Sequence, residues 1–583
     1  MSSRIPEGVR AADDAPTAAA RGAAGPRPGG AGYNPFAVAT SDPRYKWKVL
    51  VSVIFGLFMV ILDSTVVNVA LKTLQQQFSV STNEAQWVIS VYTLALGIAT
   101  PLSGFLGERF GIKKIYITGL ALFVFGSVLC GLAVGASDNI VYLVAARAIQ
   151  GAGGGIALPL GTAMLFGAFP PRERGVALGI FGIALVFAPA SGPLLGGWLV
   201  DHNLLNWIFY VNLPIGILGI SLASFFLKDR RSDRVLKADI PGIILSTLGF
   251  GALLYGASIA GEQGGGGWTD PQTLAAFTVG VLALIAFVFV ELRSPEPLLD
   301  LRLFAIRTFT VANIVGWVGI IALFGAEFLL PLYLQILRGM SAFDTGLFLL
   351  TLAITSGVIT PIAGRLSDKI GPRVLLVLGF ALIAFNTWQL REITMDTSLD
   401  WLTFLLVVRG VGFGLVIQTT LVAALRDIPG AKTARATSLV NATRQTIQSI
   451  GVAALATILT SAITINIGDE IRKNLPNPAT LPAQARAAME AGMQQFQAQL
   501  DRGGTPDLAQ VPAQIRPVIE NALHTFQQQY IAGLDHAYTA TFVVAVLAAL
   551  LSLFLPGWPA PFLSPAEAAE AGEAARDAPV PAH

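Results

Sequence analysis

The stretch GFLGERFGIKK at Gly104–Lys114 has a counterpart far along the chain, GRLSDKIGPR at Gly364–Arg373. Each stretch follows a long apolar run and places small, acidic and basic residues in a short turn. The two stretches begin 260 residues apart. The chain therefore repeats itself at long range.

A second pair of motifs keeps almost the same spacing. VAARAIQGAGGG at Val144–Gly155 and LVVRGVGFG at Leu406–Gly414 place Arg147 and Arg409 262 residues apart. Two pairs of motifs separated by nearly the same number of residues indicate a duplicated helix bundle. Internally repeated bundles bind substrate between the repeats and work by rocking one repeat against the other. This pattern predicts a transporter rather than a receptor or a membrane enzyme.

The rest of the chain is also apolar. Of its 583 residues, 54% are hydrophobic and 13% are charged, and the mean hydropathy is +0.64. A spanning helix needs about 20 mostly apolar residues, and fourteen such runs are present. They lie at 48–71, 86–106, 114–134, 140–166, 175–200, 206–227, 239–260, 272–291, 310–335, 345–366, 373–390, 400–425, 434–465 and 536–556. We predict an all-α polytopic membrane protein with two six-helix bundles and two extra transmembrane helices.

The predicted organisation has five parts. A disordered cytoplasmic tail at 1–46 precedes an N-terminal six-helix bundle at 47–230; two linker transmembrane helices at 231–300 and a C-terminal six-helix bundle at 301–558 follow, with a disordered cytoplasmic tail at 559–583. The C-terminal bundle includes a long polar outer loop at 466–535, in which Pro482–Leu500 has helical composition. The first tail lacks the apolar segment of a signal peptide, so the first span is expected to act as an uncleaved anchor.

The distribution of basic residues predicts the orientation. Short cytoplasmic loops carry an excess of Lys and Arg, and here the even-numbered connections hold most of them. The short odd-numbered connections carry only Lys72, Arg338 and Arg391. We expect a multi-pass protein of the inner (plasma) membrane with both termini in the cytoplasm.

Several function classes find no support in the composition. The net charge of +2 gives no field that would attract nucleic acid. A single cysteine, Cys130, and four unclustered histidines argue against a metal site. The phosphate-binding pattern GxxxxGK[ST] is absent, which argues against ATP as the energy source. We expect no cofactor and no catalysis; the expected partners are the lipid bilayer, protons and a small amphipathic substrate.

Four motifs together resemble the major facilitator superfamily, and within it the fourteen-span drug:proton antiporters. They are GFLGERFGIKK, RAIQG (Arg147–Gly151), APASGPLLGG (Ala188–Gly197) and LDSTVVNVAL (Leu62–Leu71), and the resemblance covers about 47–465 and the last helix. The chain departs from the family pattern at Glu108, Ile112 and Ala188, where Asp, a basic residue and Gly are more usual. The resemblance implies a proton-coupled multidrug antiporter that exports hydrophobic or cationic amphipathic compounds by alternating access.

Three charged residues inside spans are candidates for proton coupling: Asp63, Arg147 and Glu327. Charges within the membrane are costly and by default mark function. Asp63 and Arg147 fall at similar depths, so they are expected to pair or compete beside a water-reachable central chamber. In the resembled family the first-helix acid takes part in proton coupling; a structural ion pair or a substrate counter-ion is the alternative. Glu327 binds a second proton or a cationic substrate, or simply faces an outer vestibule.

Polar and aromatic residues within spans are candidate substrate contacts, with membrane-interface anchoring as the alternative: Asn68, Tyr92, Asn313, Trp317, Phe324, Tyr333, Gln335 and Gln418. The resemblance implies gating roles for the loop and antiporter motifs, with positive-inside topology and close helix packing as the alternatives. These residues are Gly104, Glu108, Arg109, Gly111, Lys113, Lys114, Gly192, Pro193, Gly196 and Gly197. Arg409 and Arg444 lie inside spans and are expected to pair structurally or to take part in gating.

Two rival functions stay open at this point. The first is export of a lipid, siderophore or secreted metabolite, with the 466–535 loop docking an envelope partner. The second is a membrane sensor or scaffold that transports nothing, which the intact loop and antiporter motifs disfavour.

Overall fold

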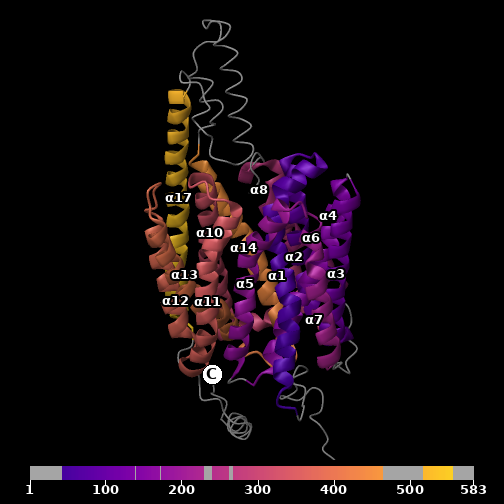
Figure 1. Ribbon diagram of the computed structural model, residues 1–583. Helices are drawn as coiled ribbons and strands as arrows, with labels where there is room; N and C mark the ends of the chain where they lie inside the picture. The colour runs from indigo at the N-terminus through magenta and orange to yellow at the C-terminus, as the bar shows by residue number, and fades with distance from the viewer. Residues whose placement is uncertain are drawn as a thin grey trace, which may run out of the picture.

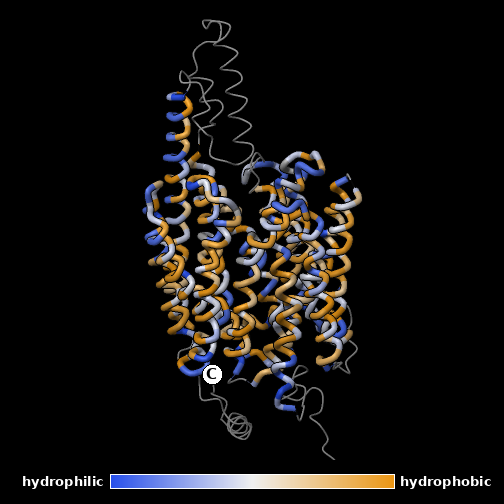
Figure 2. Tube along the Cα trace, in the orientation of Figure 1, coloured by the Kyte–Doolittle hydropathy of each residue, from blue (hydrophilic) through white to orange (hydrophobic). Residues whose placement is uncertain are grey.

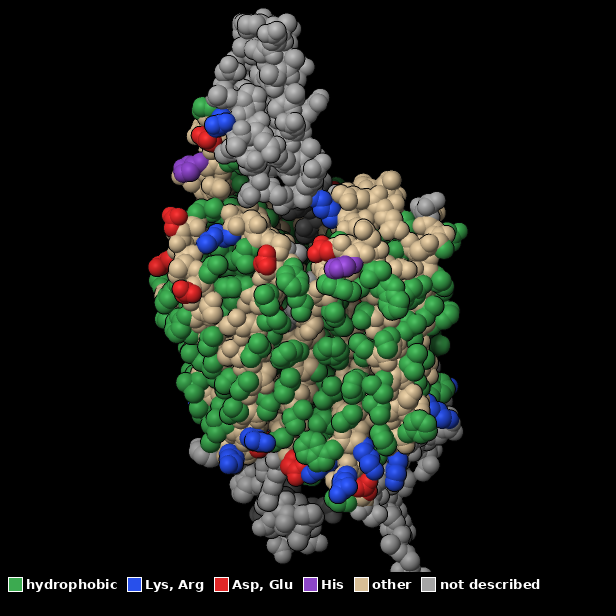
Figure 3. Space-filling view, viewed as in Figure 1, with side chains coloured by type: hydrophobic (Ala, Val, Ile, Leu, Met, Phe, Trp, Pro, Cys, Tyr) green, Lys and Arg blue, Asp and Glu red, His purple; other side chains and the backbone are tan. Residues whose placement is uncertain are grey.

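The protein is a bundle of long helices that cross a membrane many times. The computed structural model describes residues 42–137, 139–170, 173–228, 239–260, 267–463 and 516–555. In this part of the chain all regular structure is helical, and thirteen helices are long and apolar enough to span a bilayer. The helix surfaces are apolar through the middle of the molecule (Figure 2), and charged side chains gather near its two ends (Figure 3). The predicted all-α polytopic fold is confirmed.

The first half of the chain forms six spans. These are α1 (Tyr45–Phe78), α2 (Thr82–Phe110), α3 (Ile112–Ala136), α4 (Ile140–Ala168) and α5 (Arg174–Asp201), with the short α6 (Trp207–Tyr210) continuing into α7 (Asn212–Phe226) as the sixth. Two further helices, α8 (Ile240–Ala260) and α9 (Pro271–Arg293), pack on each other, and α8 also packs on α2 and α14.

The described residues of the second half also form six long helices. They are α10 (Arg307–Leu332), α11 (Ala342–Ile370), α12 (Pro372–Leu390), α13 (Leu399–Leu425), α14 (Thr433–Ser461) and α17 (Arg516–Ser552). The helix α14 corresponds to the predicted span at 434–465 but is less apolar than the other thirteen. Because it packs against α2, α8, α10 and α17, its polar residues are largely screened from lipid.

The sequence repeat corresponds to a structural repeat. Gly111 follows α2 with φ 99°, and Gly371 follows α11 with φ 81°. Only glycine adopts such angles readily, so both helices end in the same sharp turn. These two turns lie on one face of the bundle, which we call the repeat-loop face. The helix α1 begins and α17 ends at this same face (Figure 1), as an even number of crossings requires.

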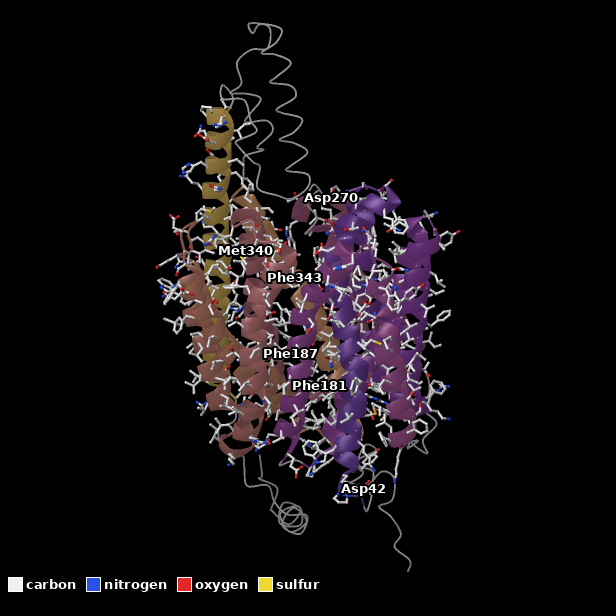
Figure 4. The ribbon with its side chains drawn as sticks, viewed as in Figure 1. Asp42, Phe181, Phe187, Asp270, Met340 and Phe343 are labelled. Carbon is white, nitrogen blue, oxygen red and sulfur yellow. The ribbon has the colours of Figure 1, made fainter. Side chains whose placement is uncertain are left out.

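The two halves meet along a pair of helix contacts that the repeat relates. In one contact α5 packs against α11, and in the other α2 packs against α14. A Cβ atom on Gly364 would collide with the backbone carbonyl of Gly175, and one on Gly104 would lie 3.0 Å from the carbonyl oxygen of Ala434. Figure 4 shows Phe187 and Phe343 along the first of these seams.

Some helices extend beyond the predicted spans. The last helix begins at Arg516 rather than at 536, so the second part of the predicted 466–535 loop is helical. Its apolar residues recur at helical spacing, at Ile519, Ala522, Phe526, Tyr530 and Leu534, but the polar residues between them mask this in a hydropathy profile. The predicted tail at 1–46 overlaps α1 by two residues. Residues 1–41, the segment Pro482–Leu500 and the tail at 559–583 lie outside the described residues.

Candidate substrate and proton-coupling sites

A buried polar cluster occupies the interior of the first half. Asp63 on α1 is 0% exposed and Arg147 on α4 is 1% exposed. The Asp63 Oδ2 accepts a hydrogen bond from Arg147 Nη1 at 2.5 Å, and its Oδ1 accepts from Gln150 Nε2 at 2.8 Å and from Asn212 Nδ2 at 2.7 Å. The expected contact between Asp63 and Arg147 is therefore present. An ion pair in low dielectric is stable only when its remaining atoms are also satisfied, and here three donors satisfy the carboxylate.

The arginine of this cluster is held as firmly as the acid. Arg147 Nε donates to the carbonyl oxygen of Val88 at 3.1 Å, and its guanidinium lies 4.1 Å from the centroid of the Tyr92 ring. The Tyr92 hydroxyl donates to the carbonyl oxygen of Val60. Tyr92, a predicted substrate contact, is thus a buried neighbour of the ion pair. The expectation that Asp63 faces a water-reachable chamber is wrong for this conformation, because tightly packed helices enclose its side chain.

The second half holds the corresponding basic residue in another way. Arg409 on α13 is 1% exposed and donates to the carbonyl oxygens of Leu323 at 2.5 Å and Ala322 at 3.2 Å, and to Asn386 Oδ1 at 3.2 Å. Glu327 on α10 interacts with Arg409 electrostatically but forms no direct ion pair or hydrogen bond with any described residue. Its side chain is partly exposed. The two acids therefore differ: Asp63 is enclosed and fully bonded, whereas Glu327 is partly buried and lacks a direct partner among the described residues.

A cavity lies within the second half, between α10, α12, α13 and α14. Two predicted substrate contacts line it. Asn313 donates through Nδ2 to the carbonyl oxygen of Phe309, and Trp317 donates through Nε1 to Thr443 Oγ1 at 3.0 Å. Arg444, predicted to pair or to gate, lines the same cavity. The cavity is about 30 Å³ in volume, so the surrounding helices must move apart before it can admit an organic molecule. Its lining combines apolar walls with a few polar groups, which is the usual composition of a small-molecule site.

The remaining predicted contacts lie elsewhere. Phe324 packs edge-on against Phe413, and the buried Tyr333 donates its hydroxyl to the carbonyl oxygen of Thr394. Gln418 is buried beside α5, where its Oε1 has no hydrogen-bond partner among the described residues. Asn68 and Gln335 are exposed. The structure brings only Asn313 and Trp317 of the predicted set to one cavity.

The loop motif closes the repeat-loop face through one of its charges. Glu108 at the end of α2 forms a 2.8 Å ion pair with Arg435 at the start of α14, across the seam between the halves. Arg109 instead lies near the rings of Phe105 and Phe110, Lys113 donates to the carbonyl of Ser224 within the same half, and Lys114 is exposed. Among the predicted loop charges, Glu108 makes the contact with the other half.

Sequence reasoning missed the second half of this closure. Asp368 stands 260 residues after Glu108, the same offset that relates the two loop motifs. Its carboxylate lies beside the backbone N–H groups of Gly175 and Val176 at the start of α5, with Arg174 nearby, and its Oδ2 has no hydrogen-bond partner among the described residues. Helix N-termini favour a negative charge. Applying the offset to Glu108 would have identified Asp368 as a gating candidate.

The glycines of the antiporter motif serve close packing of α5. A Cβ on Gly192 would collide with Thr65 of α1, and one on Gly196 would lie 2.9 Å from the carbonyl oxygen of Val66. Gly197 instead faces α11, where a Cβ would lie 3.8 Å from Phe343. Pro193 lies within the helix α5. Gly192 and Gly196 therefore allow α5 to pack closely on α1 in the first half, and Gly197 lies where α5 meets α11 of the second half.

The paired halves, the seam between them and the many apolar helices together define the fold of a membrane transporter. Residues 53–452 match the family model described as Major Facilitator Superfamily, and the chain belongs to that family.

Named relatives and a solved structure agree with this assignment. The chain is 30% identical to the lincomycin resistance protein LmrB of Bacillus subtilis over 78% of this chain and 93% of that protein. It is 33% identical to the multidrug export protein EmrB of Haemophilus influenzae over 68% of this chain and 76% of that protein. The crystal structure of the human organic anion transporter MFSD10 shares the fold, with a TM-score of 0.55 and 12% identity over 88% of this chain and all of that one.

Proposed function

We propose that this protein exports hydrophobic amphipathic compounds across the plasma membrane in exchange for protons, with both termini in the cytoplasm. The relatives named for lincomycin resistance and multidrug export support an efflux role. The mostly apolar lining of the cavity, with its few polar groups, supports amphipathic small molecules as the substrate class. The positive-inside distribution of Lys and Arg supports the orientation.

The observation that carries the proposal of proton exchange is the state of Glu327. An acid inside a membrane-spanning helix is expected to be paired, yet Glu327 has no direct partner among the described residues and is partly exposed. Asp63, by contrast, would have to break three hydrogen bonds to exchange a proton. We therefore assign proton exchange in this conformation to Glu327, while the Asp63–Arg147 pair keeps the first half rigid.

In the proposed cycle, a proton from outside neutralises Glu327 and removes its attraction for Arg409. The closed repeat-loop face then opens by separation of Glu108 from Arg435 and of Asp368 from the start of α5. Proton release to the cytoplasm restores the charge of Glu327. Substrate then binds from the cytoplasm, and the protein returns to the outward-open form with the substrate bound. Coupling of this kind requires only that the proton favour one of two conformations.

The test is transport by the purified protein in proteoliposomes under an imposed pH gradient. Three dyes of different charge serve as probes: ethidium, Nile red and 1-anilinonaphthalene-8-sulfonate. Glu327→Gln should abolish gradient-driven transport of the transported dye and retain dye exchange without a gradient. The matched control Glu392→Gln replaces an exposed acid outside the spans and should change neither. Full gradient-driven transport by Glu327→Gln would remove Glu327 from the mechanism.

The length of α17 favours a second candidate function. Its 37 residues correspond to about 55 Å, well beyond the thickness of a bilayer core, and its first turns stand out from the bundle (Figure 1). An exporter that hands a lipid or metabolite to an envelope partner would use such an extension. Deletion of 475–530 separates the two functions, because simple efflux survives it whereas handover is lost.

A further inference from the structure

The cavity of the second half contains an arginine without a counter-ion. Arg444 on α14 forms no hydrogen bond or ion pair with any of the described residues, and its side chain is partly exposed where it lines the cavity. The other interior arginines differ: Arg147 is paired with Asp63, and Arg409 is bonded to three oxygen atoms. A guanidinium inside a membrane needs an acid or several oxygen acceptors, and Arg444 has neither.

The surroundings of Arg444 place this charge at mid-depth. It lies eleven residues into α14, or about 17 Å along the helix, and Trp317 lies about 15 Å along α10 from the same face. None of the described residues that line the cavity is acidic. Its walls are mostly apolar and include Phe380, Ile417 and Leu421, and Asn313 adds a polar side chain beside them.

We propose that this cavity binds an amphipathic organic anion, whose carboxylate, sulfonate or phosphate group pairs with Arg444 while its apolar body packs against Trp317 and Phe380. A guanidinium presents a planar fork of donors that matches such groups. This inference rests on the proposed export function and replaces the cationic substrates expected from the sequence with anionic ones.

The proposed anion and proton sites are separate. Glu327 lies ten residues after Trp317 on α10, or about 15 Å along the helix. Coupling between them therefore passes through the conformation of the protein rather than through direct competition. Export of a monovalent anion and import of one proton each make the cell interior more positive by one charge. An inside-negative membrane potential therefore drives the cycle.

Equilibrium binding to the purified protein in nanodiscs tests the proposal, with two probes that share one aromatic body. These are naphthalene-2-sulfonate and 2-naphthyltrimethylammonium. We expect the sulfonate to bind at least tenfold more tightly. Arg444→Gln should weaken sulfonate binding at least tenfold and leave ammonium binding unchanged or improved, whereas Arg444→Lys should keep the preference. The matched control Arg293→Gln, which removes an exposed arginine at the end of α9, should change neither affinity.

A further variant separates charge from aromatic packing. Trp317→Leu should weaken both naphthyl probes alike, because it removes the shared ring contact. Equal binding of the two probes by the unaltered protein, tighter binding of the ammonium, or no sulfonate binding at millimolar concentration would each overturn the proposal. Because the unaltered protein alone gives these results, a folding defect in Arg444→Gln leaves the test intact. The measurement uses no gradient, so loss of proton coupling does not affect it.

Discussion

Neutralising Glu108 should open the repeat-loop face. Its carboxylate and the Arg435 guanidinium are 2.8 Å apart, with side chains 13% and 11% exposed. Removing one partner of a buried pair costs about 3–5 kcal/mol. For Glu108→Gln we use a cost of about 2 kcal/mol to the closed state, because both side chains retain some contact with water. The open state, in which this ion pair is already broken, is not destabilised by the change. At 1.4 kcal/mol per factor of ten, Glu108→Gln shifts the closed-to-open ratio by about 30-fold.

Distances between two spin labels measure this shift. Cys130, buried in α3, is the single cysteine, so Cys130→Ser gives a background for labels at Lys114→Cys and Lys369→Cys, two exposed positions on opposite halves of the repeat-loop face. An open population of about 1% would rise to about one quarter with Glu108→Gln.

The control for this experiment is a charge that does not cross the seam. Asp42 pairs with Lys48 at the start of α1, within the first half, so Asp42→Asn should leave the label distances unchanged. Asp368→Asn should widen them as Glu108→Gln does, because it breaks the related contact with α5. An unchanged distance distribution in Glu108→Gln would refute the assignment of this ion pair to closure.

Two further predictions concern stability and packing. Asn212→Ala removes one of the three donors to the Asp63 carboxylate and should lower the free energy of unfolding by about 1–3 kcal/mol, seen as a lower thermal unfolding midpoint; an unchanged midpoint would mean that the cluster needs no third donor. Gly364→Ala places a methyl group against the Gly175 carbonyl and should favour the open repeat-loop face in the same spin-label assay, whereas Gly135→Ala, whose Cβ would meet only one side chain at 3.8 Å, should have no effect.

The repeat in the sequence predicted much of the architecture and part of the site. One offset near 260 residues gave the two halves, and the matched depths of Asp63 and Arg147 anticipated their contact. The same offset applied to Glu108 leads to Asp368, so this closure contact could also have been found. These features depend on how far a residue lies along its helix, and residue numbers determine that distance at about 1.5 Å per residue.

The cavity could not be predicted in this way. Its position depends on which side of each helix faces its neighbours, and helices that are apolar all round carry no periodic signal of that side. Asn68 and Gln335, two predicted substrate contacts, have exposed side chains and do not line this cavity. The first part of α17, before residue 536, was missed for the opposite reason, because its polar residues hide a helical repeat of apolar ones. The missing partner of Arg444 appears only once the surrounding helices are in place.

Proton movement driven by substrate alone tests the central claim most directly. Proteoliposomes would be loaded with the transported dye and the pH indicator pyranine, with equal pH on both sides and no membrane potential. Dye leaving down its own gradient should draw protons inward and acidify the lumen, and Glu327→Gln should let the dye leave without this change. Dye efflux through the unaltered protein with a constant internal pH would contradict proton exchange.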